Sequence, residues 1–130
     1  MTERVYCLYR GKDQESILMQ KNACHDFAEK KGWNIVGEEQ EIGISGYKVS
    51  ADARDKLQHI RKAAERGEFD VFLVFMYDRL GRNLNETPLI AKWFNEKGIH
   101  VWSVYEGEII GGVDAEHMLD YIRFWQADIG

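Results

Sequence analysis

The 130-residue sequence is poor in the residue types that mark several protein classes. It has two cysteines and one proline, which excludes a disulfide scaffold and a proline-rich disordered chain and leads us to expect a reducing, cytoplasmic setting. No apolar run approaches the roughly 20 residues that span a bilayer, and the first residues do not resemble a signal peptide. Basic residues are also few: 17 Lys and Arg stand against 22 Asp and Glu, for a net charge of −5. Since nucleic-acid affinity depends largely on neutralising phosphates, this balance argues against a free-standing nucleic-acid binder.

What the sequence does contain is a regular alternation of strand-like and helix-like segments. Apolar residues make up 45% of the chain and aromatic residues 12%, enough for one compact domain of this length. The patterns predict strands at residues 5–10, 33–36, 71–76 and 99–105, and helices at residues 17–31, 52–66, 87–97 and 114–127. Thr87 is expected to cap the third helix, with Pro88 at its first position. This order predicts an α/β fold, an open and mostly parallel sheet flanked by helices and ending in an amphipathic helix.

The carboxyl ends of parallel strands form the edge where α/β sheets usually build their functional site. In this sequence those ends are Arg10, residues 42–46, residues 77–82 and residues 106–108. The third of them contains Asp78, Arg79 and Arg82. Guanidinium groups hold phosphate oxygens through paired hydrogen bonds, and a neighbouring carboxylate can orient an arginine or accept a proton. The plainer interpretation is a solvated polar loop with an Asp–Arg ion pair, and the residue types alone leave both open.

Four segments of the sequence carry a family resemblance. Residues 75–82 have the pattern F-x-x-D-R-L-G-R, and residues 5–10 read V-Y-C-L-Y-R. Residues 19–24 read M-Q-K-N-A-C, and residues 43–55 contain Ser-Gly followed by an arginine. In this order the segments resemble the signature, first strand, first helix and Ser-Gly loop of the serine site-specific recombinases, the resolvase and invertase family. The similarity covers nearly the whole chain and is closest to the catalytic domains of large serine recombinases.

The resemblance implies a reaction and the residues that perform it. In that family a serine hydroxyl attacks a DNA phosphodiester and forms a phosphoserine link, a 3′ hydroxyl leaves, and the joined subunits rotate before religation. No metal or nucleotide cofactor is needed, because arginines neutralise the charge that builds on the phosphate. The matching positions imply four phosphate-binding arginines, a carboxylate beside them and a polar residue of the first helix that faces the site: Arg10, Arg54, Arg79, Arg82, Asp78 and Gln20. The implied partners are double-stranded DNA and identical subunits, as a dimer and then a synaptic tetramer.

The expected nucleophile is where the sequence departs from the family pattern. The family's serine follows two residues after the strand arginine, and two residues after Arg10 this sequence has Lys12, whose amine cannot form a phosphoserine ester. Counted back from Gln20, the segment between the first strand and the first helix is several residues shorter than in the closest relatives. Three explanations remain open: residues are missing between Arg10 and Gly11, a natural member has lost the chemistry, or Ser16 serves as the nucleophile. Ser16 is otherwise expected to cap the first helix.

Two other classes of protein compete with an active recombinase domain. The main alternative is a catalytically inactive relative that keeps the fold for assembly or regulation. The other is an unrelated flavodoxin-like or receiver-like α/β module, which the sequence disfavours because Tyr9 and Arg10 stand where a receiver needs an acidic cluster. The histidines and cysteines lack the paired spacing of metal ligands, and no nucleotide-binding motif is present, so neither a metal nor a cofactor is expected.

The last segment and the net charge complete the expectations. Residues 114–127 are expected to pack against the sheet or, by the resemblance, to begin the helix through which recombinase subunits dimerise. We expect residues 1–130 to form one resolvase-like catalytic domain, without the DNA-binding domains of a longer protein. If those domains supply most of the affinity, the net charge of −5 predicts that this domain alone binds DNA weakly.

Overall fold

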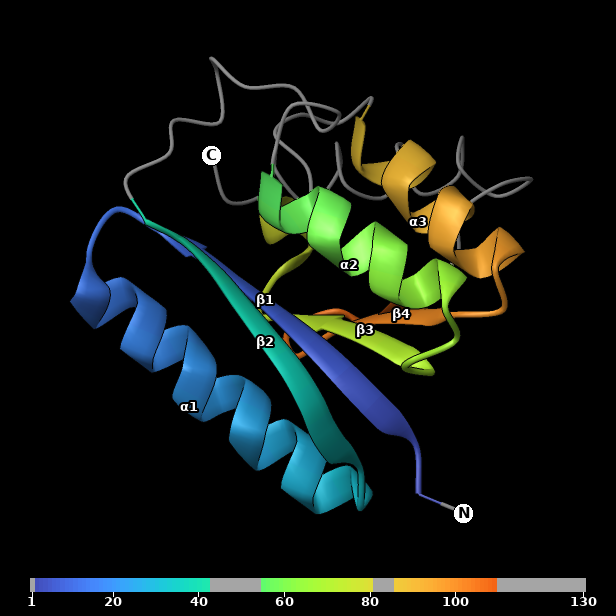
Figure 1. The fold of residues 1–130 in the computed structure, drawn as a ribbon. Coiled ribbons are helices and arrows are strands. Elements are labelled where there is room, and N and C mark those ends of the chain that lie inside the picture. The colour runs from blue at the N-terminus through green and yellow to red at the C-terminus, as the bar shows by residue number, and fades with distance from the viewer. Residues whose placement is uncertain (1, 43–54, 81–85, 110–130) are drawn as a thin grey trace.

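The computed structural model describes residues 2–42, 55–80 and 86–109 of the chain. These residues contain one five-stranded sheet with the strand order β2-β1-β3-β4-β5 (Figure 1). The elements are β1 (Arg4–Gly11), α1 (Gln14–Lys31), β2 (Asn34–Ile42), α2 (Asp55–Glu65), β3 (Val71–Val74), the 3-10 turn η2 (Tyr77–Arg79), α3 (Glu86–Glu96), β4 (His100–Ser103) and β5 (Gly107–Ile109). β1 pairs in parallel with β2 and β3, β3 pairs in parallel with β4, and β5 runs antiparallel to β4. The predicted α/β class with a mostly parallel sheet is confirmed.

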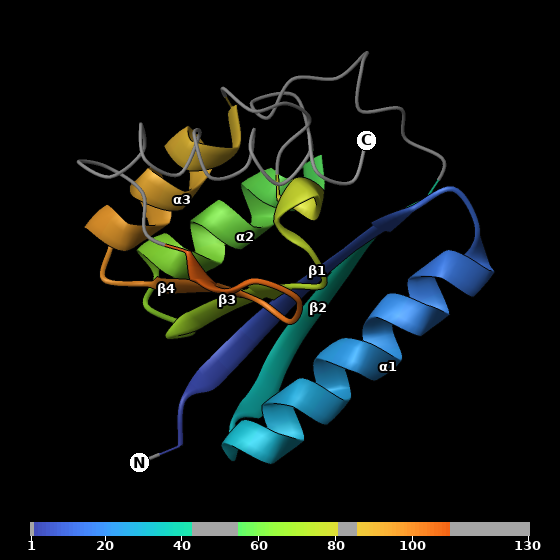
Figure 2. The ribbon, with the colours of Figure 1, turned by 180° about the vertical axis from the view of Figure 1, so that it is seen from behind.

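Helices cover both faces of this sheet. α1 lies on one face, along β1 and β2, whereas α2 and α3 lie on the other (Figures 1 and 2). Along β1, Cys7 and Tyr9 belong to the apolar cluster on the α1 face, and Leu8 belongs to the cluster under α2 and α3. Because side chains alternate along a strand, Arg10 lies on the same face as Leu8, at the end of β1.

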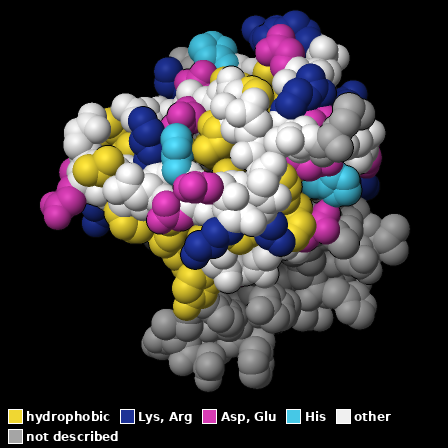
Figure 3. Space-filling view, turned by 90° about the horizontal axis from the view of Figure 1, so that it is seen from below, with side chains coloured by type: hydrophobic (Ala, Val, Ile, Leu, Met, Phe, Trp, Pro, Cys, Tyr) yellow, Lys and Arg dark blue, Asp and Glu magenta, His cyan; other side chains and the backbone are white. Residues whose placement is uncertain are grey.

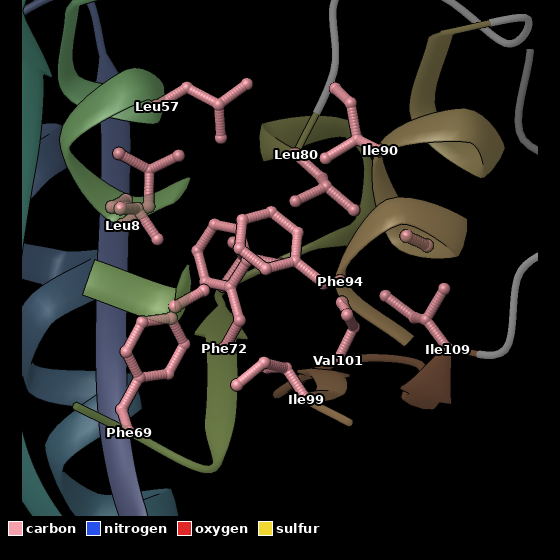
Figure 4. Packing of buried hydrophobic residues seen from close by; sticks show 14 of the residues in the cluster. Leu8, Leu57, Phe69, Phe72, Leu80, Ile90, Phe94, Ile99, Val101 and Ile109 are labelled. Atoms are coloured by element: carbon pink, nitrogen blue, oxygen red, sulfur yellow. The ribbon is translucent and has the colours of Figure 1, made fainter. Parts of the chain in front are cut away.

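The larger apolar core lies between the sheet and the pair α2 and α3. Its largest buried side chains come from the strands, from both helices, from the connection between α2 and β3 and from Leu80, directly after η2. They are Leu8, Leu57, Ile60, Phe69, Phe72, Leu80, Ile90, Phe94 and Ile109, and all but Ile60 are labelled in Figure 4. The rings of Phe72 and Phe94 pack edge to face with their centroids 4.7 Å apart. Each large side chain of this kind contributes roughly 1.5–3 kcal/mol when it is fully buried. The core therefore fixes the ends of β1 and β3 relative to α2 and α3.

The start of α1 differs from the prediction. The N-cap of the helix is Asp13, whose carboxylate accepts a hydrogen bond from the Ser16 N–H at 2.8 Å. The expectation that Ser16 caps the helix is wrong, because Asp13 supplies the acceptor three residues earlier and Ser16 lies within the first turn. The helix consequently begins at Gln14 instead of residue 17, and Gly32 ends it as predicted.

Three other elements differ in extent. β2, predicted to begin at residues 33–36 and run into the acidic stretch, extends from Asn34 through residues 38–41 to Ile42, and alternate side chains of this edge strand reach solvent. α3 begins at Glu86, so Thr87 lies inside its first turn and is not the N-cap. The predicted fourth strand ends at Ser103, and the chain returns as β5, which was not predicted; Gly107, with a φ of 94°, permits the turn.

Several predicted features lie outside the described residues. They are Arg54, Arg82, the Ser-Gly loop at residues 43–46 and the predicted helix at residues 114–127. Among the helices that are described, none has the length and apolar character needed to cross a membrane.

Candidate functional site

The carboxyl ends of β1, β2, β3 and β4 lie side by side at one edge of the sheet. This region, hereafter the carboxyl edge, comprises residues 10–11, 41–42, 75–80 and 103–106. The strand register places the four ends together, since Leu8 pairs with Val74 and Val74 pairs with Ser103. The sheet therefore brings Arg10 near the η2 turn, which carries Asp78 and Arg79.

Gln20 holds the end of β1 in place. Its side chain is fully buried; the carbonyl oxygen Oε1 accepts a hydrogen bond from the Arg10 N–H at 3.1 Å, and Nε2 donates to the Arg10 carbonyl at 2.8 Å. Both ends of the amide are thus bound to the Arg10 backbone. The geometry makes Gln20 a residue that positions Arg10 from α1, because its polar groups are already engaged within the protein.

Ser16 lies under the end of β1. A Cβ added at Gly11 would lie 2.6 Å from Ser16 Oγ and 2.9 Å from Ser16 Cβ, so only glycine fits above this serine. Ser16 Oγ also accepts a hydrogen bond from Gln20 Nε2 at 3.4 Å. β1 continues to Gly11, and α1 begins at Gln14, which leaves only two connecting residues, 12 and 13.

The η2 turn presents an arginine with unused hydrogen-bonding capacity. Arg79 Nη1 lies 3.7 Å from Asp78 Oδ1, at the outer limit of an ion pair, and the Arg79 side chain is 30% exposed. Its Nε is buried and has no hydrogen-bond partner among the described residues. A buried N–H without an acceptor costs about 1–3 kcal/mol, so an anion that reaches this guanidinium gains a donor already held in place.

Two acidic residues of the carboxyl edge are absent from the predicted site. Glu41 is buried and lies opposite Arg10 in the register of β1 and β2, where the acidic run of residues 38–41 could have pointed to it. Glu106 accepts hydrogen bonds from the Tyr77 N–H at 2.9 Å and from the Ser103 hydroxyl at 2.5 Å. No local pattern could have found the contact with Tyr77, because Tyr77 and Glu106 are 29 residues apart.

Tyr77 also carries a hydroxyl at this edge. It is buried, and its Oη has no hydrogen-bond partner within the described part of the chain. Burial, together with the charge of Glu106, raises the pKa of Tyr77 well above its ordinary value of 10. The hydroxyl therefore stays protonated at neutral pH and is not an activated nucleophile.

The predicted site residues are partly brought together. Arg10, Asp78 and Arg79 lie at the carboxyl edge, and Gln20 and Ser16 lie beneath it. Within residues 2–42, 55–80 and 86–109, no three His, Cys, Asp or Glu side chains gather as ligands for a metal ion. Cys7 and Cys24 are buried free thiols in the α1 face of the sheet.

Comparisons with known proteins agree with this fold. The family model described as "Resolvase, N terminal domain" matches residues 10–123. The N-terminal catalytic domain of TP901-1 integrase is similar with a TM-score of 0.75 and 23% identity over 98% of each chain. A resolvase family site-specific recombinase from Streptococcus pneumoniae is similar with a TM-score of 0.75 and 20% identity over 98% of this chain and 89% of that one. The catalytic domain of ISC1926 TnpA, an IS607-like serine recombinase, gives a TM-score of 0.68 and 24% identity over 92% and 79% of the two chains.

The family match covers most of the chain, so its membership is settled. The fold is that of a serine recombinase catalytic domain. The chain belongs to the resolvase N-terminal domain family, as the sequence resemblance predicts. A search of curated proteins finds no match. Because the identities to the solved structures are below 25%, those structures support the fold, and the chemistry of this chain depends on its own residues.

Proposed function

We propose that this domain acts in site-specific DNA recombination by holding a DNA phosphodiester at the carboxyl edge, through Arg79 and Arg10. The observation that carries the proposal is the Arg79 side chain, which is 30% exposed, lies 3.7 Å from Asp78 and has an Nε without a hydrogen-bond partner among the described residues. A phosphate oxygen is the acceptor that a guanidinium binds best, because two N–H groups can donate to it in parallel. Arg10, held by Gln20 at the neighbouring strand end, supplies a second positive charge.

We further propose that the chain with its present connection between β1 and α1 binds the phosphodiester without cleaving it. Cleavage in the manner the family resemblance implies needs a serine hydroxyl that reaches the phosphorus. Ser16 Oγ is packed against Gly11 and Gln20, and the buried Ser103 hydroxyl is bonded to Glu106. These contacts support the inactive form of the recombinase domain over strand transfer through Ser16.

The proposal includes weak binding by the isolated domain. Acidic and basic side chains are interspersed on the face seen from below in Figure 3, and the net charge is −5. Because acidic residues outnumber basic ones, we expect an affinity near the weak end of non-specific DNA binding, about 0.1 mM at physiological salt. Pairing of identical subunits on DNA, which the resemblance implies, would raise this affinity through a second site.

A titration with a short mixed-sequence DNA duplex at low salt tests the site. Arg79→Ala removes the guanidinium with the unused N–H, and we expect the dissociation constant to rise about tenfold, equivalent to ~1.4 kcal/mol. Arg66→Ala is the matched control, because it removes the same charge from an exposed arginine that pairs with Glu68 far from the carboxyl edge. We expect less than about a twofold change in that control.

The same samples test the absence of cleavage. Denaturing electrophoresis and mass spectrometry of the protein after incubation with a randomised duplex pool should show no DNA-linked serine peptide. A phosphoserine adduct at Ser16 would overturn the non-cleaving form of the proposal. Equal affinities of Arg79→Ala and Arg66→Ala for the duplex would overturn the assignment of the phosphate site.

A further inference from the structure

The η2 turn lacks a cap from its own sequence. Met76 occupies the N-cap position and makes no side-chain hydrogen bond, so the first N–H of the turn, at Tyr77, needs an acceptor from elsewhere. The turn is only three residues long, and its internal hydrogen bonds are Arg79 N–H to the Met76 carbonyl at 2.9 Å and Leu80 N–H to the Tyr77 carbonyl at 3.1 Å. So short a turn depends on external contacts for its conformation.

The connection between β4 and β5 supplies those contacts. Glu106 Oε1 accepts from the Tyr77 N–H at 2.9 Å, and the fully buried Ser103 is hydrogen-bonded both to this carboxylate and to the Glu106 backbone N–H. The Ser103 hydroxyl donates to Glu106 Oε1 at 2.5 Å and accepts from the Glu106 N–H at 2.8 Å. Because Ser103 pairs with Val74 in the sheet register, this arrangement begins where β3 ends.

Backbone hydrogen bonds continue the pairing beyond the strands. The Val104 N–H donates to the Val74 carbonyl at 3.0 Å, and the Tyr105 N–H donates to the Phe75 carbonyl at 3.1 Å. The bend before η2 is thus bound to the turn that follows β4. Glu106 is the last contact of this series and reaches the first residue of η2.

We infer that Glu106 is the positioning residue for Arg79. It acts through the backbone of Tyr77 and makes no contact with the phosphate itself. By capping η2 it fixes the turn two residues before the guanidinium, so that the buried Nε keeps its direction. The inference rests on the proposed role of Arg79 in phosphate binding, and it assigns a function to a residue that neither the motif nor the charge pattern identifies.

A positioning role requires the hydrogen-bond acceptor of Glu106 and does not require its negative charge. A carboxylate near a phosphate site weakens binding by repulsion, so a residue present only for its charge would be a disadvantage there. Glu106→Gln keeps an oxygen that can accept from Tyr77 and Ser103 and removes the charge. Glu106→Ala removes the acceptor as well. Only a positioning role predicts that Glu106→Ala binds duplex DNA more weakly than the wild type while Glu106→Gln binds it at least as tightly.

Hydrogen exchange and the duplex titration together test the inference. In Glu106→Ala we expect exchange of the Tyr77 amide to accelerate about tenfold or more and the duplex affinity to fall about fivefold, the ratio expected for one lost hydrogen bond of ordinary strength. In Glu106→Gln we expect Tyr77 protection to remain and the affinity to equal or exceed that of the wild type. Glu108→Ala is the control, because it removes the same charge from β5, where Glu108 pairs with the exposed His100.

The outcomes distinguish this inference from the proposed function. If Glu106→Ala keeps wild-type Tyr77 protection and affinity, or if Glu106→Gln loses both as Glu106→Ala does, the positioning role is wrong. If Arg79→Ala leaves the duplex affinity unchanged, the proposed phosphate site fails, while the exchange rate of Tyr77 and the Nε–H resonance of Arg79 still decide whether Glu106 fixes the turn. Urea unfolding of each variant identifies a general loss of fold, and Glu106→Gln tests the inference where Glu106→Ala does not fold.

Discussion

Two arginine–aspartate pairs of the described residues lie at opposite edges of the sheet, and they differ in how many hydrogen-bonding groups of the arginine are engaged. At the start of β1, Arg4 donates to Asp70 from Nη2 at 3.0 Å, from Nε at 3.1 Å and from its backbone N–H at 2.9 Å. At the carboxyl edge, Arg79 approaches Asp78 only to 3.7 Å, and its Nε has no partner among the described residues.

The difference separates a structural pair from a binding group. Arg4 and Asp70 join the start of β1 to the residue before β3, and the Arg4 guanidinium and the Asp70 carboxylate serve as each other's hydrogen-bond partners. Arg79 is equally fixed in the chain, through η2 and Glu106, yet its guanidinium is not satisfied internally. An arginine with a neighbouring aspartate is therefore found at both edges and does not by itself indicate function. What distinguishes the two edges is whether the guanidinium is hydrogen-bonded within the protein.

The largest expected effect on stability comes from breaking the support of the carboxyl edge. Gln20→Leu removes both hydrogen bonds to the Arg10 backbone and keeps the volume of the buried side chain. We expect a loss of about 2–4 kcal/mol in the free energy of unfolding, because buried backbone groups lose their partners. Urea unfolding measures it, with Gln14→Leu at the exposed start of α1 as the control, for which we expect less than about 0.5 kcal/mol. A small effect of Gln20→Leu would mean that the Arg10 end of β1 is held by other contacts.

A smaller effect distinguishes the two aspartates by pH. Hydrogen bonds from the Arg4 side chain hold the pKa of Asp70 below its usual 3.8, so the pair stabilises the fold above that pH and the stabilisation is lost as the pH falls through the lowered pKa. Asp70→Asn should therefore be less stable than the wild type at neutral pH, and the gap in urea midpoint should close in acid. Asp78→Asn should show no such gap, because Asp78 is 59% exposed and lies 3.7 Å from its arginine. If the urea midpoints of the two variants changed with pH in the same way, the distinction between the two edges would be wrong.

The sequence predicts the fold well where the signals are local. The fully buried run of β3 and the alternation of apolar segments gave the parallel sheet, and Asp78 and Arg79 were located by their place after β3. The start of α1 was misplaced, because two acceptors, Asp13 and Ser16, compete for one cap and only the backbone conformation selects between them.

Contacts that depend on tertiary structure could not be predicted. The roles of Gln20 and Glu106 depend on partners 10 and 29 residues away, which periodicity does not reveal. β5 was missed because three residues after a tight turn carry too weak a pattern for a strand. The departure from the family pattern after Arg10 is visible in the sequence, whereas the close approach of Ser16 to Gly11 depends on the fold and could not be predicted.

The salt dependence of duplex binding by Arg79→Ala and Arg4→Ala tests the central claim most directly. Each variant loses one charge and one Arg–Asp pair, so overall charge cannot explain a difference between them. We expect Arg79→Ala to bind more weakly and to reduce the slope of log K against log salt by about one, and we expect Arg4→Ala to keep the wild-type slope while unfolding at lower urea. Equal slopes for the two variants would contradict the account of the carboxyl edge as the phosphate-binding edge.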